Sequence, residues 1–552
     1  MAAALVACGA GEPALSSGSE ELNAFAKAPR DDVPEVDALG YALDLRAHVE
    51  KKKGETFDAT MRATFIATEA IDHIALDFEG NTIQQVLVDG VEAKHSRDGA
   101  HLRVDTGKKK KGASIEITID YSGDFAQADG ANPNDFTAYG GLMARQKNRA
   151  GRTIYSTLSW PYKARRWIPL RDHPRDGAMV TMRLTFPKEL HVVANGVKKS
   201  DSENSDGSRT WTYEALQSMP VYDFHFAAYD DWEEEKAAAS KSHVEVTSLA
   251  YSADKATAHA IAADLPKALD YYTANFGPYR FGNAIQFLEV PIFGGGMEHA
   301  TVVSLDETLF GSPKEARVTA FHELAHHWSG NLVRIATWND FWLSEGFTDY
   351  LTSRAVEELD GEDAARARWA AFRRSALSSD NGHALRPDGE SVDVLDIFDD
   401  VSYKKGAFVL RMLEARVGRD AFTSFMKEWF TSRAFEAATT NEFEKALEAA
   451  TKSDFSEFFN SFVYTSGHPT VRASWKRIDA QTIELALDQT QNDGPKAGYD
   501  LSLDVDVRAA ATTKRVAFRT TSKHTTRTIA LKEDPAELIL DPNVSAYFAA
   551  SK

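Results

Sequence analysis

Apolar and polar residues alternate along much of the chain up to about residue 230. The pattern is clearest at 115–121 and 180–186, where an apolar side chain occupies every second position. Strict alternation is typical of strands with one face on a hydrophobic core and the other in solvent. Gly- and Asp-containing turns separate the runs. The pattern therefore predicts an antiparallel β domain over residues 36–232.

The periodicity changes after the charged stretch DDWEEEKAAASKS at 230–242. Beyond it, apolar residues recur every three or four positions, first at 256–277 and again from Pro313 onward. This spacing is typical of helices that bury one face. We therefore predict a mainly helical domain over residues 243–467.

The last part of the chain returns to short alternating runs. They lie at 483–487, 501–507 and 516–518 and are rich in valine, isoleucine and leucine. Several short strands in succession favour a β-sandwich. We therefore predict a small C-terminal β-sandwich domain over residues 468–552, which makes the chain a multidomain α+β protein.

Length and charge narrow the class of protein. A chain of 552 residues exceeds what one hydrophobic core usually holds, in keeping with several domains. Its net charge of −19 argues against a nucleic-acid partner. The basic run Lys108–Lys111 lies between two glycines and is interpreted as a solvated turn. No run of 18 apolar residues exists, so no transmembrane helix is expected.

The single cysteine, Cys8, excludes an intramolecular disulfide. It lies in LVACG, which resembles a bacterial lipoprotein cleavage box, so residues 1–35 are predicted to be a signal and tether segment with a lipid anchor at Cys8. Only Ala2 to Ala7, without Lys or Arg, separate it from the initial Met, whereas secretory signals have a basic start and a longer apolar run. We predict an exported, periplasmic or membrane-anchored lipoprotein, with a cytoplasmic protein as the alternative.

The segment HELAHHW, beginning at His322, contains the pattern His-Glu-x-x-His. The sequence SPKE from Ser312 predicts a helix start with a capping box. On that helix His322 and His326 project from one face, where both can bind one ion. Glu323 adjoins His322, close enough to reach a water on that ion. His327 points about 100° away from His326 and is assigned to packing or to the surface.

A third ligand follows at Glu345, after eighteen intervening residues, in a second helical segment. Two imidazoles, one carboxylate and an open fourth position form the pattern of a catalytic zinc site. Thiolate ligands are excluded because the region has no cysteine. Iron also binds two histidines and a carboxylate, but it leaves Glu323 without a role. We predict one Zn²⁺ per chain, bound by His322, His326 and Glu345.

The predicted chemistry is hydrolysis of a carbonyl compound. Water bound to zinc has a pKa of about 7. Glu323 can therefore take its proton as general base, and the resulting hydroxide attacks a carbonyl carbon. The protonated carboxyl can then supply the leaving amine with a proton. The oxyanion needs a second donor, for which a tyrosine on a nearby helix would serve.

These motifs resemble those of the M1 (gluzincin) aminopeptidases, the aminopeptidase N and leukotriene A4 hydrolase superfamily. The likeness covers about Asp37 to Pro542 and rests on HELAHHWSGNLV with its spaced glutamate, on GGMEH upstream and on YKKGAFVLRML downstream. It implies an N-terminal β saddle, a thermolysin-like catalytic domain and a small β-sandwich. The large C-terminal helical domain that many members carry is expected to be absent here, which would leave the site more open.

The resemblance also assigns roles to individual residues. Tyr403 matches the family's catalytic tyrosine, the donor to the oxyanion. The substrate-binding segment is Gly295, Gly296, Met297 and Glu298. Its glutamate would hold the free α-amine of the substrate, and its glycine backbone would lie against the extended peptide. A blocked N-terminus would leave that buried carboxylate unpaired, which is costly and implies aminopeptidase selectivity.

Two positions depart from the family pattern. His299 stands where the family has asparagine. The family also supplies a second amine-binding acid a few residues before an Ala-Arg pair, here 164–165; Trp160 takes its place, with Leu158 where a glutamine is frequent. Amine recognition would then rest mainly on Glu298, and Trp160 would give the S1 pocket an apolar aromatic wall.

The leading hypothesis is a zinc aminopeptidase whose partners are peptides with a free N-terminus, with no nucleic acid and no membrane contact beyond a lipid anchor. One alternative is a zinc endopeptidase, or a peptidase of relaxed N-terminal specificity; the epoxide hydrolysis of the leukotriene branch is another. A third alternative is an inactive M1-like binding scaffold. The presence of both Glu323 and Tyr403 argues against the scaffold, which needs neither.

Overall fold

The computed structural model describes residues 35–50, 54–128, 139–145, 147–379, 382–389, 392–492 and 494–551. The predicted signal segment and its Cys8 lie outside this part of the chain. The chain folds into two compact units. The first runs to Ala274 and adds Pro278–Thr337 and Arg433–Ala437; the second holds Asn275–Gly277, Trp338–Ser432 and Ala438–Lys552.

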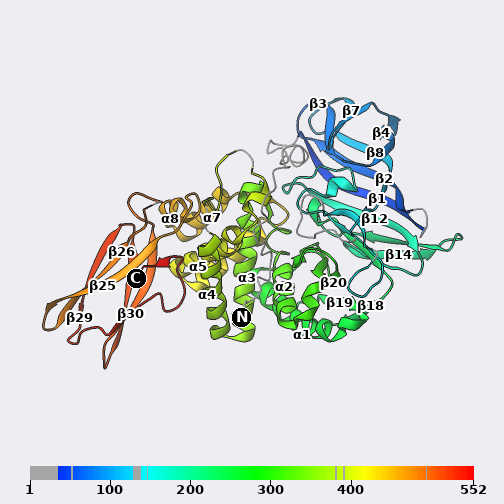
Figure 1. The fold of residues 1–552 in the computed structure, drawn as a ribbon. Coiled ribbons are helices and arrows are strands. Elements are labelled where there is room, and N and C mark those ends of the chain that lie inside the picture. Colours follow the sequence, from blue (N-terminus) through cyan, green and yellow to red (C-terminus); the bar gives the residue numbers. More distant parts are fainter. Residues whose placement is uncertain are drawn as a thin grey trace, which may run out of the picture. The chain divides into compact units, whose positions relative to one another are not determined.

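The first unit begins with a nine-stranded sheet in the order β14-β15-β12-β1-β2-β8-β4-β5, with β16 paired to β12 (Figure 1). Both alternating runs singled out in the sequence are strands of this sheet, and every second side chain of β8 faces the core. β1 pairs with β12 in parallel. By contrast, β2 pairs antiparallel with both β1 and β8. Alternation predicts strands but does not distinguish these directions. The strands are β1 (Val36–Glu50), β2 (Gly54–Ala67), β4 (Thr82–Val88), β5 (Val91–Glu92), β8 (Ser114–Asp124), β12 (Gly177–Pro187), β14 (Val197–Glu203), β15 (Ser208–Glu214) and β16 (Met219–Pro220).

Two smaller sheets complete the N-terminal β-rich part. One has the order β3-β7-β6 and the other β13-β17-β11-β10-β9. Their strands are β3 (Ile71–Asp77), β6 (His95–Asp98), β7 (His101–Lys109), β9 (Ala126–Gln127), β10 (Gly141–Arg145), β11 (Ile154–Leu158), β13 (His191–Ala194) and β17 (Phe226–Tyr229). Edge-on aromatic contacts, such as Tyr41 with Phe65 and Phe224, fill the core. The prediction of an N-terminal β-rich domain is confirmed.

The rest of the first unit is a five-stranded sheet, β18-β19-β20-β22-β21, with two helices. The strands are β18 (Trp232–Lys236), β19 (Glu245–Tyr251), β20 (Ala284–Val290), β21 (Gly296–Met297) and β22 (Val302–Asp306), and the helices are α1 (Lys255–Phe276) and α2 (Pro313–Ala325). Tyr272 of α1 donates to the backbone oxygen of Phe321 in α2 at 3.1 Å. This bond links the two helices next to the motif that α2 carries.

The predicted start of α2 is right, but its capping box is not formed. Pro313 is the first helical residue after Ser312, as the pattern indicates. The Ser312 side chain makes no capping hydrogen bond. The extended backbone of Ser312 and the fixed φ of Pro313 are sufficient to begin the helix without it.

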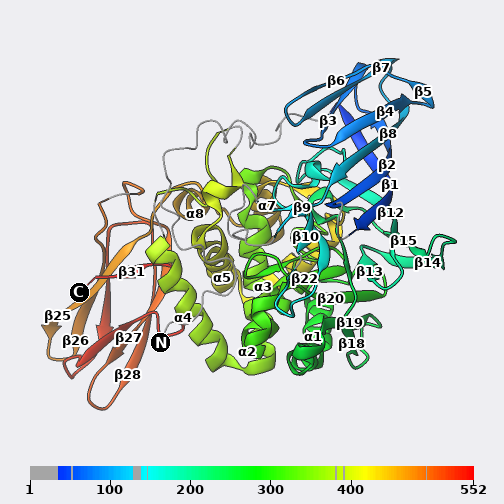
Figure 2. The same cartoon turned by 45° about the vertical axis from the view of Figure 1, so that its right-hand side comes forward.

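The second unit is helical and ends in two sheets (Figure 2). Its helices are α3 (Trp342–Asp360), α4 (Glu362–Ser379), α5 (Gly406–Val417), α6 (Arg419–Ser432), α7 (Thr440–Thr451) and α8 (Ser456–Phe462). The sheets have the orders β29-β26-β25-β31 and β28-β27-β30. Their strands are β25 (Thr470–Asp479), β26 (Thr482–Gln489), β27 (Leu501–Arg508), β28 (Thr513–Thr520), β29 (His524–Ala530), β30 (Glu537–Leu540) and β31 (Ala549–Ala550). The helical part and the C-terminal strands therefore lie where the periodicity predicts them.

None of the described helices is long and apolar enough to span a bilayer. This agrees with the expectation from the sequence. The predicted domain boundaries near 232–243 and 467–468 stay predictions, because the two compact units divide the chain at other positions.

Candidate metal centre

His322 and His326 direct their imidazoles at the same point. His322 lies in the last turn of α2 and His326 caps the helix, and both are buried. Their Nε2 atoms are 3.2 Å apart. Two nitrogens bound to one tetrahedral zinc at about 2.0–2.1 Å lie about 3.3 Å apart, so this separation fits a shared ion. The expectation that both project from one face is met within this unit.

A hydrogen bond to the backbone fixes the tautomer of the His326 imidazole. Its Nδ1 lies 3.0 Å from the backbone oxygen of Ser329, a group that only accepts. The proton therefore resides on Nδ1, and Nε2 presents a lone pair toward His322. This is the arrangement by which proteins orient a metal-binding imidazole.

Glu323 is a residue of the motif helix α2, and its side chain lies against the short strand β21. A Cβ atom added to Gly296 of β21 would collide with the Glu323 carboxylate. The strand can lie this close only because that position is glycine. Ligand atoms of Glu298, Glu323 and His326 all lie within 4.8 Å of one another. The first unit thus brings together the predicted general base, Glu323, the predicted binding group for the substrate amine, Glu298, and the predicted metal ligand His326.

Both ring nitrogens of His327 lie against backbone groups next to this cluster. The backbone N–H of Thr301 donates to its Nε2 at 3.2 Å, and its Nδ1 lies 3.3 Å from the backbone oxygen of Glu323. Burial lowers the pKa of His327 to about 3, so the ring is neutral. The Asn331 side chain also donates to the backbone oxygen of Glu298 at 2.7 Å. The assignment of His327 to packing is therefore right.

His299, where the family pattern has asparagine, stacks on a second histidine. Its ring is parallel to that of His225, with centroids 3.9 Å apart and 4° between the planes. Ser304 Oγ lies 3.0 Å from His299 Nδ1 and 3.4 Å from His225 Nε2. Burial lowers the pKa of both rings, so both are neutral. The stack ties β17 to the turn that carries Glu298.

Trp160 is buried and packs on an aromatic side chain of the glycine-rich segment. Its ring centroid lies 6.3 Å from that of Phe293, at 36° between the planes. Phe293 lies two residues before Gly295, where the predicted substrate segment begins. The contact joins the Trp160 turn to the residue that leads into the glycine-rich segment.

Glu345 and Tyr403 belong to the second unit and lie on touching elements. Glu345 is on α3, and Tyr403 is in a π-helical turn, Val401–Lys405, that leads into α5. A Cβ atom on Gly346 would lie 2.8 Å from the α-carbon of Gly406, which begins α5, and 3.0 Å from the backbone oxygen of Ser402 in the turn, so α3 is in close backbone contact with both. Lys404 also donates to Asp349 of α3 at 2.7 Å. Both predicted side chains are buried.

Comparison with known proteins decides the family. The model of the peptidase M1 N-terminal domain matches residues 38–222, and the model of the peptidase family M1 domain matches residues 262–462. The chain belongs to peptidase family M1. The family predicted from the motifs is therefore confirmed.

The M1 chain is similar to several curated relatives. It is 27% identical over 380 residues to glutamyl aminopeptidase of Sus scrofa, covering 65% of this chain and 39% of the relative. It is 26% identical over 376 residues to probable aminopeptidase 2 of Sulfurisphaera tokodaii, covering 64% of this chain and 46% of the relative. It is 26% identical over 454 residues to leukotriene A-4 hydrolase of Xenopus laevis, covering 78% of this chain and 72% of the relative. The chain thus spans less than half the length of the first two relatives.

One buried carboxyl at the M1 site carries no motif signal. Asp223 ends a short 3-10 turn, Val221–Asp223, and is 0% exposed. Burial raises the pKa of Asp223 well above its ordinary value; Glu298 raises it further and His326 lowers it. The sequence signal that would have found it is an acid inside the apolar run PVYDFHFAAY, an unusual place for an ionisable group.

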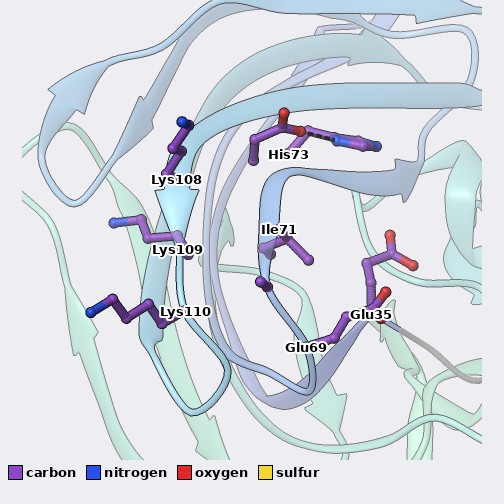
Figure 3. Close-up of a pocket in the computed structure, with 9 residues that line it drawn as sticks. Glu35, Glu69, Ile71, His73, Lys108, Lys109 and Lys110 are labelled. Carbon is purple, nitrogen blue, oxygen red and sulfur yellow. Dashed lines mark hydrogen bonds and ion pairs between the residues drawn. The ribbon is translucent and has the colours of Figure 1, made fainter.

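A second concave region of the first unit does not resemble a site. A cavity of about 660 Å³ lies beside β3 and β7 and includes Lys108, Lys109 and Lys110. Figure 3 shows the ammonium ends of Lys109 and Lys110 pointing away from Ile71 and the glutamates across the cavity. Lys109 instead pairs with Asp89. Lys108 and Lys109 end β7, so the run predicted to be a turn begins in a strand.

Proposed function

We propose that this M1 chain is a zinc aminopeptidase that hydrolyses the N-terminal peptide bond of peptides. The observation that carries the proposal is the convergence of His322 and His326 Nε2 atoms at 3.2 Å, next to the buried carboxylates of Glu323 and Glu298. Buried ionisable groups gathered in one place are typical of sites that bind a charged ligand. A metal ion and a substrate ammonium are two such ligands.

The proposed metal ligands are His322, His326 and Glu345, with one Zn²⁺ per chain. The tautomer of His326 and the separation of the two nitrogens fit zinc, and the third ligand follows from the sequence spacing. When bound, zinc polarises a carbonyl group and lowers the pKa of water that it coordinates.

Glu323 is proposed as the general base. Its carboxylate is buried against the Gly296 backbone, where it accepts the proton of the attacking water and passes it to the leaving amine. Tyr403 would donate its hydroxyl proton in a hydrogen bond to the oxygen of the scissile carbonyl. Support for that role is the match of its segment to the family and its fixed position against α3.

Glu298 is proposed to bind the free α-ammonium of the substrate, with the backbone of Gly295, Gly296 and Met297 along the peptide. The carboxylate is 5% exposed, so it discriminates against a blocked N-terminus, which would leave it unpaired. The finer architecture remains part of the proposal: a β saddle, a thermolysin-like domain and a small β-sandwich. Export and lipid attachment stay predictions, because Cys8 lies outside the described residues.

The proposal is tested with alanine, leucine, arginine and phenylalanine p-nitroanilides, each free and N-acetylated. We expect hydrolysis of the free forms only, abolished by 1,10-phenanthroline and restored by Zn²⁺. Glu323→Gln should keep its zinc and lose about 10²- to 10⁴-fold in kcat, the usual contribution of general acid–base catalysis.

Two outcomes would contradict the proposal. Hydrolysis of the acetylated substrates at similar rates would favour a peptidase of relaxed specificity, a hypothesis that the apolar Trp160 supports. Zinc binding without hydrolysis of any substrate would favour the scaffold hypothesis.

A further inference from the structure

His383 of the second unit has both nitrogens of its ring on hydrogen-bond acceptors. Nδ1 lies 2.8 Å from the backbone oxygen of Ala384, and Nε2 lies 2.9 Å from the carboxylate of Asp399. A backbone oxygen and an ionised carboxylate only accept, so both ring nitrogens must donate. Only the imidazolium form has a proton on each nitrogen. The geometry therefore indicates that His383 and Asp399 form an ion pair.

The groups around the ring agree with this assignment. Burial lowers the pKa of His383, but the hydrogen bond and charge of Asp399, together with the backbone oxygen of Ala384, outweigh it and raise the pKa above its ordinary value of 6.5. Lys405 acts in the opposite direction and lowers the pKa of His383. The two side chains of the pair are 17% and 25% exposed, so water screens their attraction only in part.

Asp399 also binds the start of the turn that carries Tyr403. Its Oδ1 accepts the backbone N–H groups of Val401 at 2.9 Å and of Ser402 at 3.3 Å. Its backbone oxygen accepts the N–H of Tyr403 at 3.3 Å. The first N–H groups of a helical turn have no partner within the turn, and a side-chain oxygen before it commonly supplies one. One carboxylate therefore joins the imidazolium to the turn.

The segment that carries the imidazolium is itself anchored in the second unit. The side-chain amide of Asn339 donates to the backbone oxygen of Pro387 at 3.2 Å. The backbone N–H of Arg386 donates to the backbone oxygen of Val463 at 3.0 Å. The ion pair therefore connects the turn of Tyr403 to a segment that is held independently of it.

The ring of Tyr403 is packed against two aromatic side chains. Its centroid lies 5.9 Å from that of Phe341 and 5.7 Å from that of Phe398, both in edge-on contacts. Because apolar burial is not directional, the position of the hydroxyl also depends on where the backbone of the turn lies. A donor to an oxyanion works only when it is held at hydrogen-bond distance from that oxygen. The bonds that Asp399 makes to this backbone therefore help to fix the hydroxyl.

We propose that His383 is a positioning residue: its imidazolium, paired with Asp399, holds the turn in which Tyr403 presents its hydroxyl to the substrate. The inference rests on the proposed function, in which that hydroxyl donates to the oxygen of the scissile carbonyl. Positioning is complete at pH values below the ordinary pKa of 6.5 and is lost as pH rises through the higher pKa that His383 has in the fold.

The first test compares His383→Leu with the unmodified chain on leucine p-nitroanilide. At about pH 6 we expect kcat to fall by about 10- to 100-fold, the loss that a displacement of about 1 Å causes. KM should change by less than about threefold, because an oxyanion donor acts in the transition state rather than on the bound substrate. The ratio of the two kcat values should decline as pH rises through the pKa of His383, where the unmodified ring also loses its charge.

His383→Lys is the rescue variant, because lysine supplies a cation whose ordinary pKa is about 10.4. We expect it to recover most of the kcat at low pH and to keep it over the range in which His383 titrates. Asp399→Asn is a second variant, which removes the charge of the pair and keeps an oxygen for the two N–H groups of the turn. It should reproduce the kinetic effect of His383→Leu, and thermal unfolding checks that each variant is folded.

His524→Gln is the matched control. Its Nδ1 lies 2.6 Å from the carboxylate of Asp488, on strands β29 and β26 of the same unit. The change therefore removes another contact between a histidine and an aspartate, among the C-terminal strands. It should leave kcat and its pH dependence unchanged.

A second measurement does not depend on activity. The chain is labelled with tyrosine that carries ¹³C at Cζ, and Tyr403→Phe identifies the NMR resonance of Tyr403. We expect this resonance to shift with pH along the same curve as the His383 ring, followed by ¹⁵N NMR. In His383→Leu the Tyr403 resonance should stay constant over that range.

Three results would overturn the inference and leave the proposed function intact: the same ratio of kcat values at every pH, loss of zinc from His383→Leu, or a Tyr403 resonance that does not follow the titration of His383. The first would make His383 a packing residue, and the second would assign its effect to the metal. If the unmodified chain hydrolyses no aminoacyl amide but the Tyr403 resonance still follows His383, the proposed function fails and the link from His383 to the turn stands.

Discussion

Adjacent histidines of one motif have different hydrogen-bond patterns in this protein. His326 gives its Nδ1 proton to a backbone oxygen and presents Nε2 to His322. His327 accepts a backbone N–H at Nε2, so that nitrogen has no lone pair left for a metal. The hydrogen bonds of each ring, rather than the residue type, therefore distinguish the proposed metal ligand from the packing residue.

This difference predicts the effect of replacing each ring. His326→Ala should lower zinc affinity by more than about 100-fold, since even the loss of a partner that only orients a ligand costs about 10- to 100-fold. His327→Asn should keep one zinc per chain and lose thermal stability. Metal content after dialysis, measured by atomic absorption, distinguishes the two. Equal zinc loss in both variants would show that His327 is a ligand.

At the scale of elements, glycines allow the closest approaches around the proposed catalytic residues. Gly296 allows β21 to lie against Glu323 in the first unit, and Gly346 allows α3 to touch the turn of Tyr403 in the second. At both positions a side chain on the glycine would push the neighbouring element away, so only glycine allows the contact. The helix contact is reinforced by Tyr350 and Arg354 of α3, which donate to Glu414 of α5 at 2.5 and 2.9 Å.

Gly346→Ala is expected to destabilise the second unit. Its Cβ would lie 2.8 and 2.9 Å from backbone atoms of Gly406, which cannot move aside as a flexible side chain would. Overpacking of this kind costs about 1–3 kcal/mol, to be measured by urea unfolding followed by far-UV circular dichroism.

Gly311→Ala is the control for this prediction, because no atom of the described residues other than its chain neighbours lies within 4 Å of its added Cβ. It should leave the free energy of unfolding unchanged within about 0.5 kcal/mol. If both variants unfold at the same urea concentration, the contact between α3 and the Tyr403 turn is looser than its geometry indicates.

At the scale of the whole molecule, the acidic character of the chain extends into its interior. Asp172 and Asp176 are buried carboxyls whose pKa burial raises to about 6, and burial raises the pKa of Glu289 to about 9. Each raised pKa means that the folded chain holds a proton that the unfolded chain releases at lower pH. The folded state therefore loses stability as pH rises through these ranges.

Glu289 predicts a measurable part of this pH dependence. Its pKa is about 9 in the fold against an ordinary value of 4.5, so its contribution is fully present below pH 4.5 and declines up to about pH 9. A one-proton difference changes the free energy of unfolding by about 1.4 kcal/mol per pH unit. Glu289→Gln should flatten the decline between pH 5 and 8, measured by urea unfolding. Parallel pH profiles for the two proteins would contradict the assignment.

Local pattern was sufficient for much of the fold and for the core of the site. The alternation at 115–121 and 180–186, the helical period at 256–277 and the helix start at Pro313 all correspond to elements of the structure. The sequence by itself also determined the family and the candidate residues His322, Glu323 and His326. These features depend on neighbours a few residues apart, which the chain order already contains.

Only the tertiary structure decided the features built from distant segments. The parallel pairing of β1 with β12 and the stacking of His225 on His299 each join residues far apart in the chain. Ser312 likewise has the right sequence for a capping box that does not form. Whether a polar side chain is a cap, a core partner or a binding group depends on which distant groups fold around it. These distant groups leave no periodic pattern in the local sequence, so spacing and composition cannot predict them.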